Sequence, residues 1–324
     1  MRLRDRPVLV APDSFKGTLA APVVAAAIGR GLGRAGLPAD LAPVADGGEG
    51  TMAVLVERLG GELVSAAAHD PLGRPITASF ALLAGGQRAI VEVAAASGLA
   101  LVEPEHRDAE AASSAGTGEL IAAAVDAGAT HVLVAAGGSA STDGGAGAIG
   151  ALRDAGGLRG ARISVLCDVR TPFERAAIVF APQKGADAAA VERLSARLAA
   201  FGLPREVPMS GAAGGLAGGL WASLDAALLP GAGYVLGALD FDRRMLAARA
   251  VIVGEGRLDA TSLQGKIAAE IATRARQHVV PAHAIVGSAA IDRFDARILD
   301  LQEIREAGDE VSIEAAAYAL AGVI

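Results

Sequence analysis

Residues 8–36, VLVAPDSFKGTLAAPVVAAAIGRGLGRAG, place a short apolar run, a polar loop and an Ala-rich stretch in succession. The run 8–12 is rich in Val and Leu and stops at Asp13, as a buried strand does. The stretch 22–36 ends in Gly, a common residue just past the end of a helix. A buried strand that leads into a helix is typical of a parallel sheet covered by helices.

The same alternation continues along the chain and predicts an α/β protein. The further expected strands are 88–93, 131–136, 163–167, 177–181, 250–254 and 283–287. The further expected helices are 51–61, 118–129, 189–202 and 266–278.

One region breaks this alternation. Between Asp70 and Leu99, two strand patterns flank the pair Gly85-Gly86, which predicts a hairpin instead of a strand-helix-strand unit. The chain of 324 residues is also longer than one average domain. We therefore expect residues 1–61 and 240–324 to form one discontinuous domain and residues 62–239 to form an inserted second α/β domain, with the active site in the cleft between them.

The composition excludes several classes of protein. A formal charge of −7 and a pI near 5.3 leave no basic stripe for nucleic acid. Cys167 is the single cysteine, so no internal disulfide can form, and its apolar run predicts a core residue. No apolar run reaches the length of a membrane span, and the run before Pro12 is too short for a signal peptide. We expect a cytoplasmic protein without nucleic-acid or membrane partners.

Four loops at strand ends combine Gly with charged side chains. They are 11–18 (APDSFKGT), 44–51 (VADGGEGT), 135–148 (AAGGSASTDGGAGA) and 254–266 (GEGRLDATSLQGK). In open α/β sheets, ligands bind where such loops meet. Gly lets backbone N–H groups approach a phosphate, and carboxylates suit Mg²⁺ coordination or general-base work. The combination indicates phosphoryl transfer, although any one of these loops could be an ordinary structural turn.

Nucleotide-binding motifs of fixed spacing are absent from the sequence. The pattern G-x-x-x-x-G-K-[ST] fails at Ala260 and at Ile267. No G-x-G-x-x-G unit stands between a strand and a helix with the spacing that dinucleotide binding needs. The five histidines show no metal-ligand spacing, and with one cysteine a zinc site is not expected.

Taken together, the motifs resemble those of the type I bacterial glycerate kinases from end to end. They are APDSFKGTL, PVADGGEGT, IVEVAAASGLALV, AGTGEL, GGSASTDGGAGA, CDV (167–169), APQKGA (181–186), GAAGGL (211–216) and GEGRLDATSLQGK. The resemblance implies a discontinuous flavodoxin-like (Rossmann-type) domain with an inserted domain. It also implies ATP-dependent phosphorylation of D-glycerate, commonly at the C2 hydroxyl to give 2-phosphoglycerate. Formation of 3-phosphoglycerate, a phosphate-ester enzyme and a non-catalytic sensor of small acids are the alternatives.

The chain departs from the pattern of that family in three places. Ser141 and Thr142 stand where Thr and Asn are common, which conserves hydrogen bonding. The segment 152–163 is shorter than usual, and the region after Gly287 is abbreviated. Because these deletions lie outside the Gly-rich loops, they bear on oligomerisation and cleft closure more than on the chemistry.

The charged residues of the loops are the candidate site residues. We assign catalysis to Asp143, Asp259, Asp46 and Lys16, with Asp143 and Asp259 as expected Mg²⁺ ligands. The expected substrate- and phosphate-binding residues are Asp13, Ser14, Gly47, Gly48, Glu49, Gly137, Gly138, Ser139, Ser141, Thr142, Lys184, Glu255, Arg257 and Lys266. ATP, Mg²⁺ and D-glycerate are the expected ligands of a monomer or homodimer.

Each of these assignments has a structural alternative. Glu49 precedes a helix and could only cap it. Arg257 could pair with Asp259 instead of clamping a substrate carboxylate. Lys266 could be a surface lysine. Asp168 follows a buried strand and could have either a functional or a structural role.

Overall fold

The computed structural model describes residues 6–259, 262 and 266–324. The chain forms two compact units, one made of Met1–Asp46 with Val235–Ile324 and the other of Gly47–Tyr234. These boundaries differ from the ones expected from the sequence, at 61/62 and 239/240. The earlier boundary at residue 46 follows from helix α2 (Thr51–Leu59), because that helix packs on strands of the second unit.

The first unit contains a five-stranded parallel sheet. Its strands are β1 (Val8–Pro12), β2 (Ala39–Leu41), β9 (Ala250–Asp259), β10 (Ala282–Ala290) and β11 (Leu301–Glu306). Their order across the sheet is β11-β10-β9-β1-β2. Counted along this unit, that is the order 5-4-3-1-2, the flavodoxin-like arrangement read from its far edge. The connections reverse direction between β1 and β9, and ligands of such folds bind at that point.

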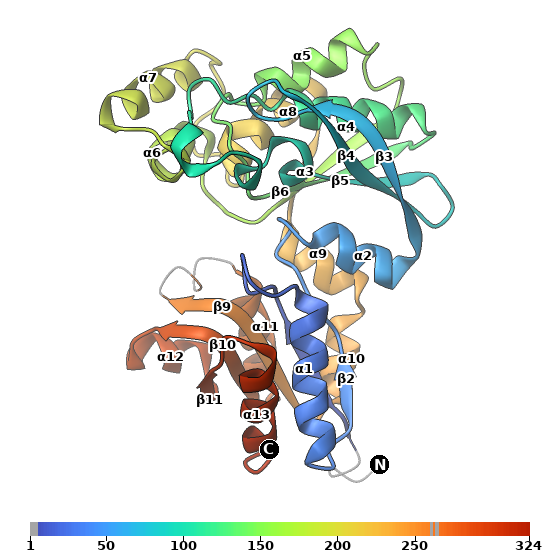
Figure 1. The fold of residues 1–324 in the computed structure, drawn as a ribbon, viewed down its shortest axis with the longest axis vertical. Coiled ribbons are helices and arrows are strands. Elements are labelled where there is room, and N and C mark those ends of the chain that lie inside the picture. Colours follow the sequence, from blue (N-terminus) through green and yellow to red (C-terminus); the bar gives the residue numbers. More distant parts are fainter. Residues whose placement is uncertain (1–5, 260–261, 263–265) are drawn as a thin grey trace. The chain divides into compact units, whose positions relative to one another are not determined.

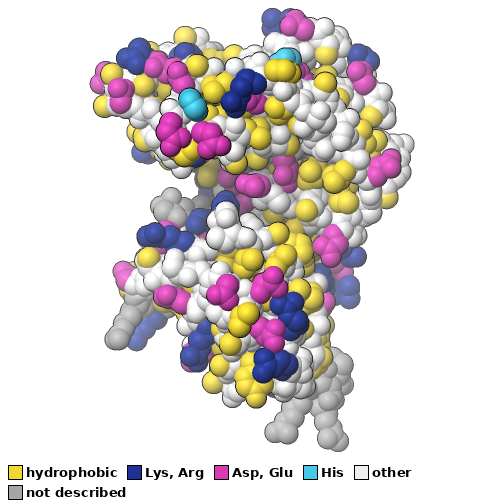
Figure 2. All heavy atoms as spheres, viewed as in Figure 1, with side chains coloured by type: hydrophobic (Ala, Val, Ile, Leu, Met, Phe, Trp, Pro, Cys, Tyr) yellow, Lys and Arg dark blue, Asp and Glu magenta, His cyan; other side chains and the backbone are white. Residues whose placement is uncertain are grey.

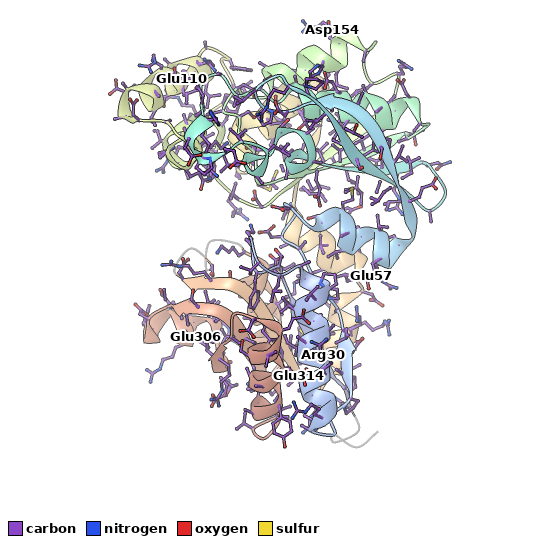
Figure 3. All side chains as sticks on the ribbon, viewed as in Figure 1. Arg30, Glu57, Glu110, Asp154, Glu306 and Glu314 are labelled. Atoms are coloured by element: carbon purple, nitrogen blue, oxygen red, sulfur yellow. The ribbon has the colours of Figure 1, made fainter. Side chains whose placement is uncertain are left out.

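The helices of the first unit cover this sheet. They are α1 (Ala21–Arg34), α10 (Phe241–Ala247), α11 (Ile267–Gln277), α12 (Arg293–Leu299) and α13 (Glu310–Leu320), and α9 (Gly231–Ala238) spans the change of unit. Figure 1 shows α1 and α13 side by side. Arg30 of α1 donates to Glu314 of α13 at 3.0 Å, and both are labelled in Figure 3. The core beneath these two helices includes Val8, Val10 and Ile252, all fully buried.

The second unit contains a six-stranded mixed sheet. Its strands follow one another in space as they do in sequence: β3 (Gly61–His69), β4 (Pro75–Leu83), β5 (Arg88–Glu92), β6 (His131–Ala136), β7 (Arg162–Cys167) and β8 (Ala227–Pro230). Strands β3, β4 and β5 pair antiparallel, and strands β5 to β8 pair parallel, so that β5 belongs to both parts. The hairpin expected around Gly85-Gly86 is present as β4 and β5. Both glycines have positive φ, the conformation that such a turn requires.

The remaining helices of the second unit lie around this sheet, as Figure 1 shows. They are α3 (Val93–Ser97), α4 (Ala115–Asp126), α5 (Ala146–Asp154), α6 (Ala176–Phe180), α7 (Ala188–Ala199) and α8 (Leu216–Leu224). The expected strand 177–181 is therefore wrong, because this segment lies within and just after α6. Ala176, Ala177 and Ala181 are buried while Ile178 is 55% exposed, which is the spacing of a helix face and not of a strand.

The surface drawn in Figure 2 mixes charges of both signs. On that face, within the coloured part of the chain, Lys and Arg side chains alternate with Asp and Glu and form no continuous basic stripe. Over the described ranges, none of the helices combines the length and the apolar character that crossing a membrane would require.

Candidate active site

A pocket of about 420 Å³ lies at the carboxyl ends of the strands of the first unit. Its lining residues are Asp13, Ser14, Phe15, Lys16, Thr18, Asp46, Glu255, Gly256, Arg257, Lys266, Gly287, Ser288 and Gly308. They come from the ends of all five strands and from the start of α11. The pocket therefore occupies the position where α/β sheets bind their ligands.

Three acidic residues of this region are each paired with a basic one. Lys16 Nζ lies 3.7 Å from Asp46, and Lys266 Nζ lies 3.3 Å from Glu255. Arg257 donates to Asp259 at 3.1 Å. The expected structural pair of Arg257 and Asp259 is thus present, and it is compatible with a role at the pocket because Arg257 also lines it.

Asp13 is the most perturbed carboxylate of the pocket. Only 7% of it is exposed, and its Oδ1 accepts a hydrogen bond from the Ser14 N–H at 2.6 Å. Burial, followed by the nearby carboxylate of Asp46, raises the pKa of Asp13 to about 7. Burial also raises the pKa of Glu255, against the opposing charge of Lys266. Two carboxyl groups of the pocket are therefore buried and hold a proton more readily than exposed ones do.

In the second unit, Asp143 organises the Gly-rich loop 137–145 that follows β6. Its Oδ2 accepts from the Ser114 N–H (2.9 Å), the Ser114 hydroxyl (2.8 Å) and the Gly147 N–H (3.1 Å). Its Oδ1 accepts from the Gly145 N–H at 3.0 Å. Four donors hold this buried carboxylate, so it fixes the start of α5. Ser114 had no motif of its own in the sequence, and only its position before AGTGEL pointed to it.

Lys184 lies inside the second unit and not on its surface. The residue is 2% exposed, and its ammonium donates to Ser139 Oγ at 2.9 Å and to the Ser141 carbonyl at 2.5 Å. Burial lowers the pKa of Lys184 to about 7, although the charges of Asp143 and Asp168 oppose the shift. The side chain therefore supports the loop 137–145 from within.

Two Gly-Gly pairs pack backbone to backbone beside that loop. A Cβ at Gly137 would lie 2.6 Å from Gly48 Cα and 3.0 Å from Asp168 Oδ2, so a side chain has no room there. A Cβ at Gly47 would lie 2.6 Å from Gly231 Cα. Next to Gly137, Gly138 lies close to the carboxylate of Glu49. The structure thus brings loops 47–50 and 137–139 together with two carboxylates.

Buried polar groups without partners mark the same region. Among the described residues, Ser141 Oγ, Thr142 Oγ1 and Thr51 Oγ1 have no hydrogen-bond partner. Glu92, at the end of β5, accepts from the Met52 N–H at 2.7 Å, and burial raises its pKa. Sequence reasoning missed Glu92, although its place at a strand end is the signal that selected the other loops.

Within the described residues, no group of three or more His, Cys, Asp or Glu side chains is arranged to hold a metal ion. Of the two expected Mg²⁺ ligands, Asp143 already binds four donors and does not fit. Asp259 ends β9, with 24% of its side chain exposed. It fits an ion carried by a nucleotide, because Mg²⁺ in such sites takes one or two carboxylates and otherwise phosphate and water oxygens.

A flavodoxin-like sheet with acidic and basic side chains gathered at its switch point defines an α/β enzyme that acts on a charged small molecule. A family model described as the glycerate kinase family matches residues 8–157 and 153–316. The chain belongs to the glycerate kinase family.

Individual relatives agree with this placement. The chain is 38% identical to a glycerate kinase of Bacillus subtilis (strain 168), covering 88% of this chain and 86% of the relative. It is 36% identical to a glycerate 2-kinase of Escherichia coli (strain K12), with the same two coverages. A crystal structure of a glycerate kinase 2 candidate from Salmonella typhimurium LT2 superposes with a TM-score of 0.80 at 32% identity and covers 98% of each chain.

Proposed function

We propose that this enzyme transfers the γ-phosphoryl group of ATP to the C2 hydroxyl of D-glycerate, giving 2-phosphoglycerate and ADP, as a type I member of its family. The observation that supports it most is the switch-point pocket, which places two lysines, an arginine and three carboxylates around one cavity. A glycerate kinase must hold an anionic substrate and a triphosphate, and it must also accept a proton from a hydroxyl group. The relative named glycerate 2-kinase supports the choice of the C2 hydroxyl over the C3 hydroxyl.

The residues of the pocket divide naturally between these tasks. Lys16, Lys266 and Arg257 supply positive charge for the carboxylate of glycerate and for phosphate oxygens. Asp46 and Glu255 hold the two lysines in place, at 3.7 Å and 3.3 Å. Ser14 lies beside them and can donate a hydrogen bond to either substrate.

The second unit holds a separate set of backbone N–H groups and hydroxyls suited to phosphate. Asp143 and Lys184 fix the Gly-rich loop, which also holds Ser141 and Thr142; the hydroxyls of these two residues are buried and have no hydrogen-bond partner among the described residues. Glycines 47, 48, 137 and 138 complete this phosphate-binding set together with Ser139, and Glu49 is assigned to substrate binding. Mg²⁺, held by Asp259 and by the phosphates, would neutralise charge on the triphosphate. We place the enzyme in the cytoplasm, as a monomer or homodimer.

Product analysis tests this function directly. Phosphorus NMR of a reaction with ATP, Mg²⁺ and D-glycerate should show ADP and 2-phosphoglycerate, with much slower turnover of L-glycerate and glycerol. Glycerol lacks the carboxylate, so turnover as fast as with D-glycerate would contradict recognition by the pocket's cations. A 3-phosphoglycerate signal would move the attack to the C3 hydroxyl, and glycerate binding without ADP formation would indicate a sensor.

A further inference from the structure

Asp13 occupies a fixed position at the switch point of the first sheet. It follows β1 directly, and its N–H donates to the Gly254 carbonyl of β9 at 2.8 Å. On the other side, the carbonyl of Pro12 accepts from the Val44 N–H at 3.0 Å. Because both flanks of this strand end are hydrogen-bonded, the carboxylate of Asp13 is presented to the pocket from rigid backbone.

The carboxylate of Asp13 differs from the other carboxylates of the pocket region. Asp46, Glu255 and Asp259 each lie within ion-pair distance of a Lys or Arg. For Asp13, the described part of the chain offers one hydrogen bond, from Ser14, and no ion pair. An ion pair stabilises the carboxylate anion and so opposes the effect of burial, as Lys266 does at Glu255, whereas Asp13 has no such ion pair within the described ranges and takes up a proton more readily.

We propose that Asp13 is the general base of this kinase and that its carboxylate accepts the proton of the attacked glycerate hydroxyl. The proposal rests on the proposed function. In the step, the substrate O–H bond breaks and the proton passes to Asp13, while an electron pair of that oxygen forms the new bond to the γ-phosphorus of ATP. The bond from the γ-phosphorus to the bridging oxygen breaks, and its electron pair leaves with ADP. The proton then passes to solvent.

The charges that face Asp13 suit this role. Burial raises the pKa of Asp13 most, Asp46 after β2 and Glu255 of β9 raise it further, and the Ser14 N–H and Lys16 in its own loop lower it. Lys266, before α11, acts on Glu255 and lowers its pKa. The net result is a pKa of about 7 for Asp13, and a general base is most effective when its pKa lies near the working pH.

The variant Asp13→Asn tests the proposal. Asn keeps the size of the side chain and an oxygen that can accept from the Ser14 N–H, but it cannot take the proton. We expect kcat to fall by about 10²–10⁴-fold. The parent's kcat/KM should rise with pH through about 7, where Asp13 loses its proton, and this rise should be missing in Asp13→Asn. Asp13→Glu, which restores a carboxylate, should recover part of the activity and the rise.

Thermal stability separates a base from a structural residue. The pKa of Asp13 is raised in the folded protein, so between about pH 4 and pH 7 the folded state binds more protons than the unfolded state. The stability of the parent protein therefore falls as pH rises through this range. Asp13→Asn lacks this loss and should melt at the same or a higher temperature than the parent at pH 8. A structural aspartate would give the opposite result.

Asp40→Asn is the matched control. It makes the same chemical change in the same sheet. Asp40 does not line the pocket, and its carboxylate lies 2.7 Å from the guanidinium group of Arg244. Its pH profile should match that of the parent protein. The proposal is overturned if Asp13→Asn keeps kcat within threefold with its pH rise intact. It is also overturned if calorimetry with a non-hydrolysable ATP analogue shows that lost binding accounts for the whole effect. A parent protein that forms no ADP with glycerate would refute the proposed function, and this inference with it.

Discussion

The ammonium group of Lys184 donates a hydrogen bond to Ser139 Oγ at 2.9 Å and a second one to the Ser141 carbonyl at 2.5 Å. A lysine that is 2% exposed cannot act as a free phosphate-binding cation on the surface. Its two acceptors both lie in the loop 137–145, whose other end is held by Asp143. Lys184 is thus a positioning residue for that loop.

Lys184→Met should lower kcat/KM by about 10²-fold, because a shift of the loop by 1 Å is enough for such a loss. Met keeps the length of the side chain but leaves Ser139 and the Ser141 carbonyl without their donor. Steady-state kinetics with both substrates provide the measurement. The matched control is Arg153→Met, which removes an exposed cation of α5. It should leave kcat/KM unchanged for both substrates. Equal behaviour of the two variants would exclude the positioning role.

The buried lysine also predicts a pH dependence of stability. The pKa of Lys184 is lowered to about 7 in the folded protein, against about 10.4 in an unfolded chain. Between these values the unfolded state binds the extra proton, so the contribution of Lys184 to stability rises as pH increases from 7 to 10. The difference in free energy of unfolding between the parent protein and Lys184→Met should therefore grow in favour of the parent over this range. Urea titrations at pH 7 and pH 9.5 measure it, and a constant difference would contradict the shift.

The hydrogen bonds around Asp143 determine what Asp143→Asn should do. Asn offers one acceptor oxygen and turns an amide N–H toward groups that are themselves donors. We expect a loss of stability of about 3–5 kcal/mol, as when a buried charge partner is removed, together with a large loss of kcat. Asp154→Asn, at the exposed end of α5 and labelled in Figure 3, is the control and should change neither. An Asp143→Asn protein with parental stability and low kcat would assign Asp143 to the chemistry alone.

Much of the fold follows from local pattern. Buried strands such as 8–12 and 131–136 are apolar runs that stop at Gly or Asp, and they are present as β1 and β6. Strand β11, LQEIRE, carries charges on an edge of the sheet and therefore lacks an apolar pattern. Strand β8 is only four residues long. The segment 177–181 was predicted as a strand because it contains β-branched residues, but these lie on the exposed side of helix α6.

Part of the candidate site could also be predicted from the sequence. The carboxyl ends of parallel strands meet at one edge, so Asp13, Asp46 and Glu255 gather in one pocket although they are distant in sequence. The burial of Lys184 and its contact with Ser139 depend on tertiary packing, which no local pattern records. The hydrogen bond from the Ser114 hydroxyl to Asp143 also depends on tertiary packing, so the sequence did not predict it.

A tight approach beneath the Gly-rich loop gives a steric test. Gly214 has a φ of +68°, and a Cβ there would lie 2.0 Å from the Ser141 carbonyl oxygen and 3.0 Å from Lys184 Nζ. Gly214→Ala should therefore displace the loop, lowering both the melting temperature and kcat/KM. Gly150→Ala, in α5 with no neighbour within 4 Å of the new methyl group, should be neutral or slightly stabilising. Parental activity in Gly214→Ala would show that the loop tolerates movement.

The lysines of this chain give the last test. Of 29 Lys and Arg residues only three are lysines: Lys16 and Lys266 line the pocket of the first unit, and Lys184 is buried beside the Gly-rich loop of the second. Lysine carries a compact ammonium group, whereas the guanidinium group of arginine is planar and larger. Lys184→Arg should lower both the melting temperature and kcat/KM, because a guanidinium group does not fit the space that holds the ammonium group. Overpacking of a core costs about 1–3 kcal/mol. The reverse change, Arg153→Lys on exposed α5, should be silent. Melting temperature and kcat/KM of both variants decide the matter, and a fully active Lys184→Arg protein would mean that any buried cation can hold the loop.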